Sequence, residues 1–129
     1  MPTGLYGKLP AHGDFVRRRL PDGFVEPWDA WLQEGIAAAR DALGDGFIEA
    51  WTVAPAWRFR LPAGACGAQP TAGVVMPSED TVGRRFPLTL AAVFAGGAAP
   101  PSASWYDLIE DTARTGRDTG AAADALLAA

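Results

Sequence analysis

The sequence predicts an α/β (α+β) domain in which helices cover a central mixed, largely antiparallel sheet of about five strands. Short segments with strand-like alternation or continuous apolar residues recur along the chain, separated by turn residues. Other segments carry apolar residues at helical spacing. The chain has 129 residues, 49% of them hydrophobic, which is enough for one domain with a core. We therefore expect residues 1–129 to form a single domain.

The first part of the chain contains two short extended segments, residues 5–9 and 14–20, joined by a loop of residues 10–13. Gly13 gives this loop the backbone freedom that a turn needs. Neighbouring strands joined by a short loop pair antiparallel, so we expect a hairpin-like pair. Residues 21–23 (PDG) then predict a turn.

A helix is predicted over residues 27–43, since Pro27 suits the first helical position and Gly44 suits a C-terminal cap. Apolar residues at spacings of three and four predict one buried face, formed by Trp28, Trp31, Leu32, Ile36, Ala39 and Leu43. A shorter amphipathic segment around Trp51 follows and ends at Pro55.

The middle of the chain predicts three strands. Residues 56–61 alternate large apolar side chains with arginines, which is typical of a half-buried strand. Residues 71–76 are almost wholly apolar, as in a strand covered on both faces. Residues 86–94 are apolar on both alternating sets apart from Thr89, and this pattern indicates a central strand.

The C-terminal part predicts two helices. Ser104, with Asp107 three residues later, resembles a capping box, and Gly116 is expected to end this helix. A second helix is predicted over residues 119–127. The resulting order of elements is similar to that of longin-like or profilin-like domains, an analogy of fold that carries no function.

Composition and charge disfavour several classes of function. The net charge of −4 opposes general nucleic-acid binding and a polybasic membrane anchor. No stretch of 18 apolar residues occurs, so direct membrane insertion is not expected, and the first residues do not read as a signal peptide. The single cysteine, Cys66, cannot form an internal disulfide, and the chain is expected to be cytoplasmic.

Residue types that carry catalysis or bind metals are sparse. One histidine and one cysteine do not form a zinc motif, so we expect no metal and no cofactor. Ser78, His12 and Asp14 supply the side chains of a hydrolytic triad, but Ser78 has no Gly-x-Ser-x-Gly context. A small hydrolase that uses His12 and Asp14 therefore stays open as a weaker alternative.

Two polar stretches, residues 8–19 and 77–85, are not explained by packing. Both lie at the ends of predicted strands, where loops often carry binding residues. We predict that they contact a partner through Lys8, His12, Asp14, Arg17, Asp80, Arg84 and Arg85. The alternative is a solvated surface, or a pairing of Asp14 or Asp80 with an arginine that fixes the loops.

Sequence motifs in these stretches resemble those of the TagF family associated with bacterial type VI secretion. The resembling segments occur in the family's order: residues 7–16 (GKLPAHGDFV), 27–32 (PWDAWL), 55–59 (PAWRF), 73–80 (GVVMPSED) and 82–88 (VGRRFPL). The part of the chain after residue 90 is less distinctive. Several motifs in one order are more specific than any one of them.

The resemblance implies a cytoplasmic, non-catalytic accessory protein of the secretion system. Some TagF proteins are post-translational repressors that engage the forkhead-associated-domain protein of the system, and this protein is the partner that the resemblance implies. No catalytic residues follow from the resemblance. A structural subunit of the secretion apparatus is an alternative reading.

Overall fold

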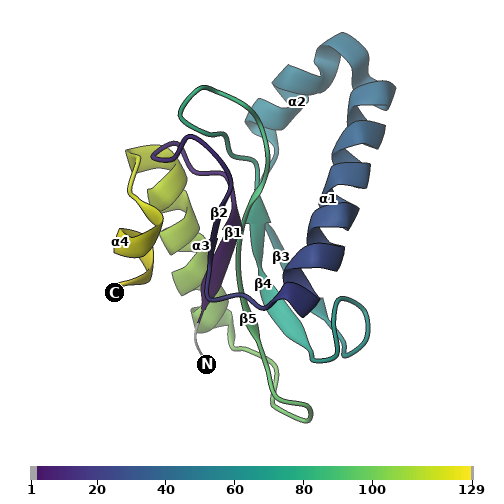
Figure 1. Cartoon of the computed structure of the whole chain (residues 1–129), viewed down its shortest axis with the longest axis vertical. Coiled ribbons are helices and arrows are strands. Elements are labelled where there is room, and N and C mark those ends of the chain that lie inside the picture. Colours follow the sequence, from purple (N-terminus) through teal and green to yellow (C-terminus); the bar gives the residue numbers. More distant parts are fainter. Residues whose placement is uncertain (1–2, 129) are drawn as a thin grey trace.

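The computed structural model describes residues 3–128 and consists of three layers, with helices on both faces of one sheet (Figure 1). The sheet contains β1 (Gly4–Gly7), β2 (Val16–Arg18), β3 (Trp57–Leu61), β4 (Thr71–Met76) and β5 (Leu88–Val93). Its strand order is β2-β1-β5-β4-β3, and each neighbouring pair is antiparallel. The predicted fold class and the hairpin-like first pair are confirmed, although all four pairings are antiparallel rather than mixed.

Helix α1 (Asp22–Leu43) covers one face of the sheet and begins five residues earlier than the sequence predicts. Pro21 is its N-cap, and the amides of Phe24 and Val25 both donate to the Pro21 carbonyl. Pro27 therefore lies inside the helix, where its missing N–H leaves the Gly23 carbonyl without the usual helical donor. The early turns form because Phe24 and Val25 are buried against the sheet.

The buried face of α1 is only partly as predicted. Trp28 and Leu32 are buried, but Trp31 is 62% exposed and Leu43 is 48% exposed. Figure 1 accounts for Leu43, because the last turns of α1 extend beyond the sheet. Gly44 caps this helix, as predicted.

A short helical turn, η1 (Gly44–Gly46), leads into α2 (Phe47–Val53), which runs back toward β3. This helix matches the predicted amphipathic segment and ends before Pro55. Phe47 is buried, whereas Ile48 and Val53 are exposed. Together α1 and α2 form the helical layer on one side of the molecule.

Helix α3 (Ala103–Thr119) and the short α4 (Ala123–Leu127) cover the opposite face. The N-cap of α3 is Ser102, whose hydroxyl accepts from the Trp105 amide, so the prediction of a cap at Ser104 is wrong. The helix also continues through Gly116, which is buried where α3 approaches Leu9 and Leu126. A Cβ atom on Gly116 would lie 2.5 Å from Leu126 Cδ1, so glycine serves close packing here rather than termination.

The two faces of the sheet carry separate hydrophobic clusters. On the α3 and α4 side these residues are Leu5, Leu9, Val16, Val74, Met76, Leu88, Leu90, Ile109, Ala113, Ala123 and Leu126. On the α1 side they are Leu20, Phe24, Val25, Trp28, Leu32, Cys66, Phe86 and Ala91. Burial of each large apolar side chain stabilises the fold by about 1.5–3 kcal/mol relative to exposure. Alternating residues of β4 and β5 contribute to both clusters, which explains their continuous apolar sequences.

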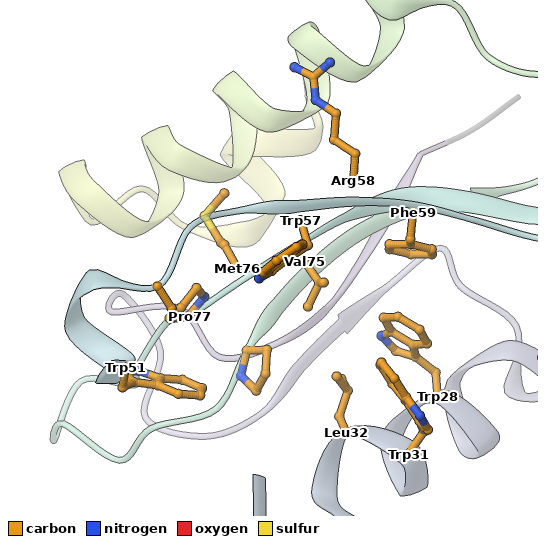
Figure 2. A pocket seen from close by; sticks show the side chains of 12 residues that line it. Trp28, Trp31, Leu32, Trp51, Trp57, Arg58, Phe59, Val75, Met76 and Pro77 are labelled. Atoms are coloured by element: carbon orange, nitrogen blue, oxygen red, sulfur yellow. The ribbon is translucent and has the colours of Figure 1, made fainter. Parts of the chain in front are cut away.

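Strand β3 is an edge strand, a fact that its alternating sequence did not reveal. Phe59 and Leu61 are half-buried on the α1 side, as the alternation predicts. Trp57 is 63% exposed because the sheet ends at this strand and α1 does not cover it. Arg58 points to the opposite face, toward α3 (Figure 2).

Candidate functional site

The two polar loops singled out in the sequence lie against each other. The amide of Thr81 donates to the His12 carbonyl at 2.8 Å, and the Thr81 hydroxyl donates to the Pro10 carbonyl at 2.8 Å. The guanidinium of Arg84 donates to the Gly13 carbonyl at 2.6 Å. These bonds join the loop after β1 to the loop after β4 into one rigid surface.

Asp80 is the centre of this joint and is only 2% exposed. Its carboxylate accepts from the amides of Val82 and Arg84 at 3.0 and 2.9 Å. It also accepts from Arg84 Nε at 2.8 Å and pairs with Lys8 Nζ at 3.3 Å. Burial raises the pKa of the Asp80 carboxyl. The hydrogen bonds that the carboxylate accepts outweigh this effect and lower the pKa to about 2; the donors are the Arg84 amide, Lys8, the Arg84 guanidinium and the Val82 amide. The carboxylate therefore stays charged and holds the loop.

Lys8 is buried to 7% exposure, and its ammonium group also lies 4.9 Å from the centre of the Phe15 ring. Phe15 in turn packs against Tyr6 and Phe86. Burial, followed by the hydrogen bond to Asp29, raises the pKa of the Tyr6 hydroxyl. Lys8 thus links the polar joint to an aromatic cluster.

His12 connects the same loop to the C-terminal helices. Its Nε2 accepts a hydrogen bond from the amide of Ala123 at 3.1 Å, at the beginning of α4. The neighbouring Asp14 is exposed, and its carboxylate accepts from the Phe15 amide at 2.7 Å. Nε2 of His12 is therefore already hydrogen-bonded to a backbone amide.

The remaining two predicted residues differ in their contacts. Arg17 donates to the Leu20 carbonyl at 3.0 and 2.8 Å and pairs with Asp22 at 2.5 Å, which fixes the start of α1. Arg85 is half-buried and makes no ion pair among residues 3–128. It lines a polar hollow of about 630 Å³ beside Arg114 and Arg117.

The structure therefore brings Lys8, His12, Asp80 and Arg84 together through two joined loops, with Asp14 at their rim. Arg17 lies at the start of α1 and Arg85 at the polar hollow. The Asp80–Arg84 pairing matches the alternative in which an aspartate fixes the loops. Partner binding by these seven residues stays a prediction.

An apolar groove of about 490 Å³ lies between α1, α2 and the β3 edge, and sequence reasoning did not identify it (Figure 2). Its lining consists of Trp28, Trp31, Leu32, Trp51, Ala54, Trp57, Arg58, Phe59, Val75, Met76, Pro77 and Pro87. Four of the five tryptophans of the chain are in this set. The number of tryptophans in the chain, and the spacing of Trp28 and Trp31 by about one helical turn, are the sequence signals that could have indicated the groove.

Aromatic stacking gives the groove its shape. The Trp28 ring stacks on Phe59 of β3, with centroids 4.6 Å apart, and on Trp31, with centroids 5.1 Å apart. Trp28 is buried beneath them, while Trp31 and Trp57 stay largely exposed on the two sides. A contiguous exposed apolar surface of this kind is characteristic of protein-binding sites.

Arg58 lines the groove, but α3 holds its guanidinium on the opposite face of β3. Its guanidinium donates to Asp107 Oδ1 at 2.6 Å and to Glu110 Oε1 at 3.1 Å. The bond from Arg58 is the main reason that the pKa of Glu110 is lowered. These contacts fix the polar face of β3 and leave its other face to the apolar groove.

Residues that could hold a metal do not cluster in the part of the chain that the structure describes, where no group of three His, Cys, Asp or Glu side chains occurs. Cys66 is buried, and burial raises the pKa of its thiol, so the reactive thiolate is disfavoured. Between residues 3 and 128, no helix has the length and apolar character required to cross a bilayer.

Comparison with known proteins assigns the chain to a family. A family model described as the TagF N-terminal domain, type VI secretion system-associated, matches residues 4–129. The fold is similar to the crystal structure of PA0076 from Pseudomonas aeruginosa PAO1, solved at 2.05 Å, with a TM-score of 0.92 and 40% sequence identity. Comparison with curated proteins gives no match.

The similarity to PA0076 covers 98% of this chain and 60% of that protein, so the chain spans less than two thirds of its relative's length. The family model covers essentially the whole chain and includes both polar loops and the tryptophan groove. The resemblance first suggested by the sequence motifs is confirmed. The chain belongs to the TagF family of type VI secretion system-associated proteins, and it corresponds to the N-terminal domain of that family.

Proposed function

We propose that this domain is a non-catalytic regulatory binding module that restrains type VI secretion post-translationally. It acts in the cytoplasm by binding the forkhead-associated-domain component of the secretion system. The family supports a role as an accessory of type VI secretion. The choice of a binding function rather than catalysis rests on the apolar groove between α1, α2 and β3.

The groove has the composition of a binding hot spot. Trp31 and Trp57 are 62% and 63% exposed, on opposite sides of a surface that also includes Trp51. Tryptophan is enriched among the few residues that dominate interface energies, because it buries a large area with little loss of conformational entropy. A partner that covers these rings would remove water from them and hold the secretion component in an inactive state.

The joined polar loops supply a second candidate contact surface. Asp14 and Arg85 are the members of the predicted set with the fewest bonds inside the described chain. The polar hollow beside Arg85 borders Trp51, Ala54 and Pro77, which also line the apolar groove. One partner could therefore cover the apolar centre and reach a polar rim, as interfaces commonly do.

The test is a binding titration of the purified domain against the forkhead-associated-domain protein of its own secretion cluster. We expect saturable binding that the double variant Trp31→Ala/Trp57→Ala weakens by at least about tenfold. Leu108→Ala is the matched control, since Leu108 is 65% exposed on α3, away from the groove, and this variant should bind as the unmodified domain does.

The outcomes separate the parts of the proposal. If the unmodified domain does not bind while both proteins are folded, the forkhead-associated partner is wrong. If it binds and the double variant binds equally well, the groove is not the contact surface. Thermal unfolding of each variant shows whether a lost interaction reflects lost folding.

A further inference from the structure

Strand β3 is a free edge of the sheet. It pairs with β4 from Trp57↔Val75 to Leu61↔Thr71, and the strand order gives it no second neighbour within residues 3–128. Backbone N–H and C=O groups on an edge strand form a template for another strand. Addition of an extended segment to such an edge is a recurring mode of peptide recognition.

One face of a segment added to β3 would meet the groove. Trp57 and Phe59 are two residues apart on β3 and therefore lie on the same face. Trp31 of α1 and Trp51 of α2 lie across the groove from them (Figure 2). Side chains of an added strand alternate in the same way. Every second residue of the segment would therefore lie beside tryptophan rings and should be large and apolar.

The other face of the added segment would meet arginines. Arg58 and Arg60 alternate with the aromatic residues of β3, so both lie on the side of α3. Arg58 is already paired with Asp107 and Glu110, but Arg60 is exposed and makes no ion pair among the described residues. Opposite charges on neighbouring strands stabilise a sheet, so the residues facing Arg60 should be acidic.

The same arginines disfavour a second copy of this chain as the occupant. If two β3 strands paired antiparallel about Phe59, each Arg58 would lie opposite the Arg60 of the other copy. Like charges directly opposite each other destabilise a strand pair. Arg60 is the arginine of β3 without an ion pair among the described residues, so its charge favours an acidic segment over the arginine-bearing sequence of β3 itself.

The backbone of β3 is compatible with an added strand. The Tyr106 hydroxyl donates to the Phe59 carbonyl at 2.9 Å, which holds the strand against α3. A carbonyl oxygen has two lone pairs, so this bond leaves capacity for another donor. Within residues 3–128, α3 makes no other hydrogen bond to the backbone of β3.

We propose that β3 and the tryptophan groove bind an extended protein segment in which large apolar residues alternate with acidic residues, and that this segment adds to the sheet as a sixth strand. The inference deepens the proposed function, on which it rests, by naming the chemistry of the segment that a secretion partner presents. The partner would therefore contribute an extended segment to the contact rather than the surface of a folded domain.

The probe is a short peptide of alternating valine and glutamate, titrated into the unmodified domain and followed by tryptophan emission. A second peptide has the same composition but groups its valines and its glutamates in two blocks. We expect saturable binding of the alternating peptide and at least about tenfold weaker binding of the block peptide. Equal binding of the two peptides, or no binding of either up to about 1 mM, would overturn the proposal.

Backbone pairing is tested by methylating peptide nitrogens. Two versions of the alternating peptide carry N-methyl groups at every second residue, in opposite phases. Since one edge of an added strand faces β3, one phase should abolish binding and the other should preserve most of it. Retained binding of both versions would contradict strand addition even if the groove is occupied.

Charge selection is tested with Arg60→Glu. This exposed substitution should weaken binding of the valine–glutamate peptide by roughly fivefold and strengthen binding of a valine–lysine peptide. Arg40→Glu is the matched control, because Arg40 is an exposed residue of α1, and it should leave the preference between the two peptides unchanged. A variant with Arg60→Glu that treats both peptides as the unmodified domain does would show that the arginine face does not select acidic residues.

The peptide experiments do not use the forkhead-associated-domain protein, so the two proposals can fail separately. If the protein binds and the alternating peptide does not, strand addition is wrong and the proposed function stands. If the peptide binds with the expected phase and charge preferences but the protein does not, the mode of binding stands and the partner is wrong.

Discussion

The indole Nε1 of Trp28 donates a hydrogen bond to Oγ1 of Thr89, 2.9 Å away, in the buried layer between α1 and β5. Thr89 is the one polar residue that interrupts the apolar sequence of residues 86–94. The bond satisfies two polar groups that would otherwise be buried without a partner. It also fixes the ring against which Phe59 and Trp31 stack, so it determines the floor of the groove.

The first prediction concerns this bond. Thr89→Val keeps the shape of the side chain but leaves the indole N–H unpaired, and should lower the free energy of unfolding by about 1–3 kcal/mol. Trp28→Phe should cost more, through the cavity it leaves, but in its presence Thr89→Val should cost less than it does alone. Denaturant unfolding of the two single variants and the double variant measures this coupling; strictly additive costs would contradict a bond of energetic importance.

The second prediction concerns the pH dependence of stability. The pKa of Asp80 is about 2 in the folded protein against an ordinary 3.8, so its stabilising contribution is present above about pH 4 and is lost as the pH falls toward 2. Asp80→Asn should therefore lower the Tm most at neutral pH, and the difference from the unmodified protein should shrink in acid. Thermal unfolding of both proteins from neutral pH down to about pH 2 measures this difference in Tm. Substitution of the exposed Glu34 by Gln is the control. A difference in Tm that does not vary with pH would show that the charge of Asp80 is unimportant.

The third prediction separates the two neighbouring arginines. Arg84→Ala removes bonds to Asp80 and to the Gly13 carbonyl and should destabilise the domain by about 1 kcal/mol, since the side chain is partly exposed. Arg85→Ala should leave the free energy of unfolding nearly unchanged while it weakens binding of the secretion partner. Unfolding and binding are measured on the same preparations. If Arg85→Ala leaves partner binding intact, the polar hollow is not part of the interface.

The fourth prediction concerns His12 and the C-terminal helix. His12→Ala removes the acceptor of the Ala123 amide and should lower stability by about 1 kcal/mol. Amide hydrogen exchange should accelerate in α4 more than in α3, because the bond is made at the beginning of α4. Uniform acceleration through both helices would mean that His12 supports the whole domain rather than this junction.

The fifth prediction compares two helical glycines. Gly35 lies on α1, where an added Cβ meets no atom within 4 Å, so Gly35→Ala should stabilise the domain by about 0.5–1 kcal/mol. Gly116→Ala would place its Cβ 2.5 Å from Leu126 and 2.9 Å from Leu9. This variant should be destabilised despite the same gain in helix propensity. A higher Tm for both variants would show that α4 moves away at little cost.

The order of elements could be predicted from the sequence because it depends on local patterns. Alternation identified the strands, and spacings of three and four identified the helices. The start of α1 was misplaced because Pro27 satisfies the local rule for a first helical position, whereas burial of Phe24 and Val25 extends the helix before it. Tertiary packing prevailed over a local preference in this case.

The surfaces depend on contacts between distant segments, and sequence patterns do not specify them. The alternation in residues 56–61 predicts a half-buried strand whether it lies at the centre or at the edge. Its position at the edge follows from the pairing of β1 with β5, which joins residues far apart in the chain. The groove beside Trp57 depends on that position, and for the same reason the sequence identified the charged loops but missed the groove.

The pairing of β1 with β5 also constrains the order in which the chain can fold during synthesis. Gly4 pairs with Ala91, so β1, which is synthesised before β5, must wait for β5 to complete this ladder. The apolar face of β1 and β5 is then covered only when Ile109 and Leu126 of α3 and α4 arrive. A nascent chain that stops before α3 therefore exposes a continuous apolar sheet face, which makes chaperone binding and degradation by proteases most important for the incomplete chain.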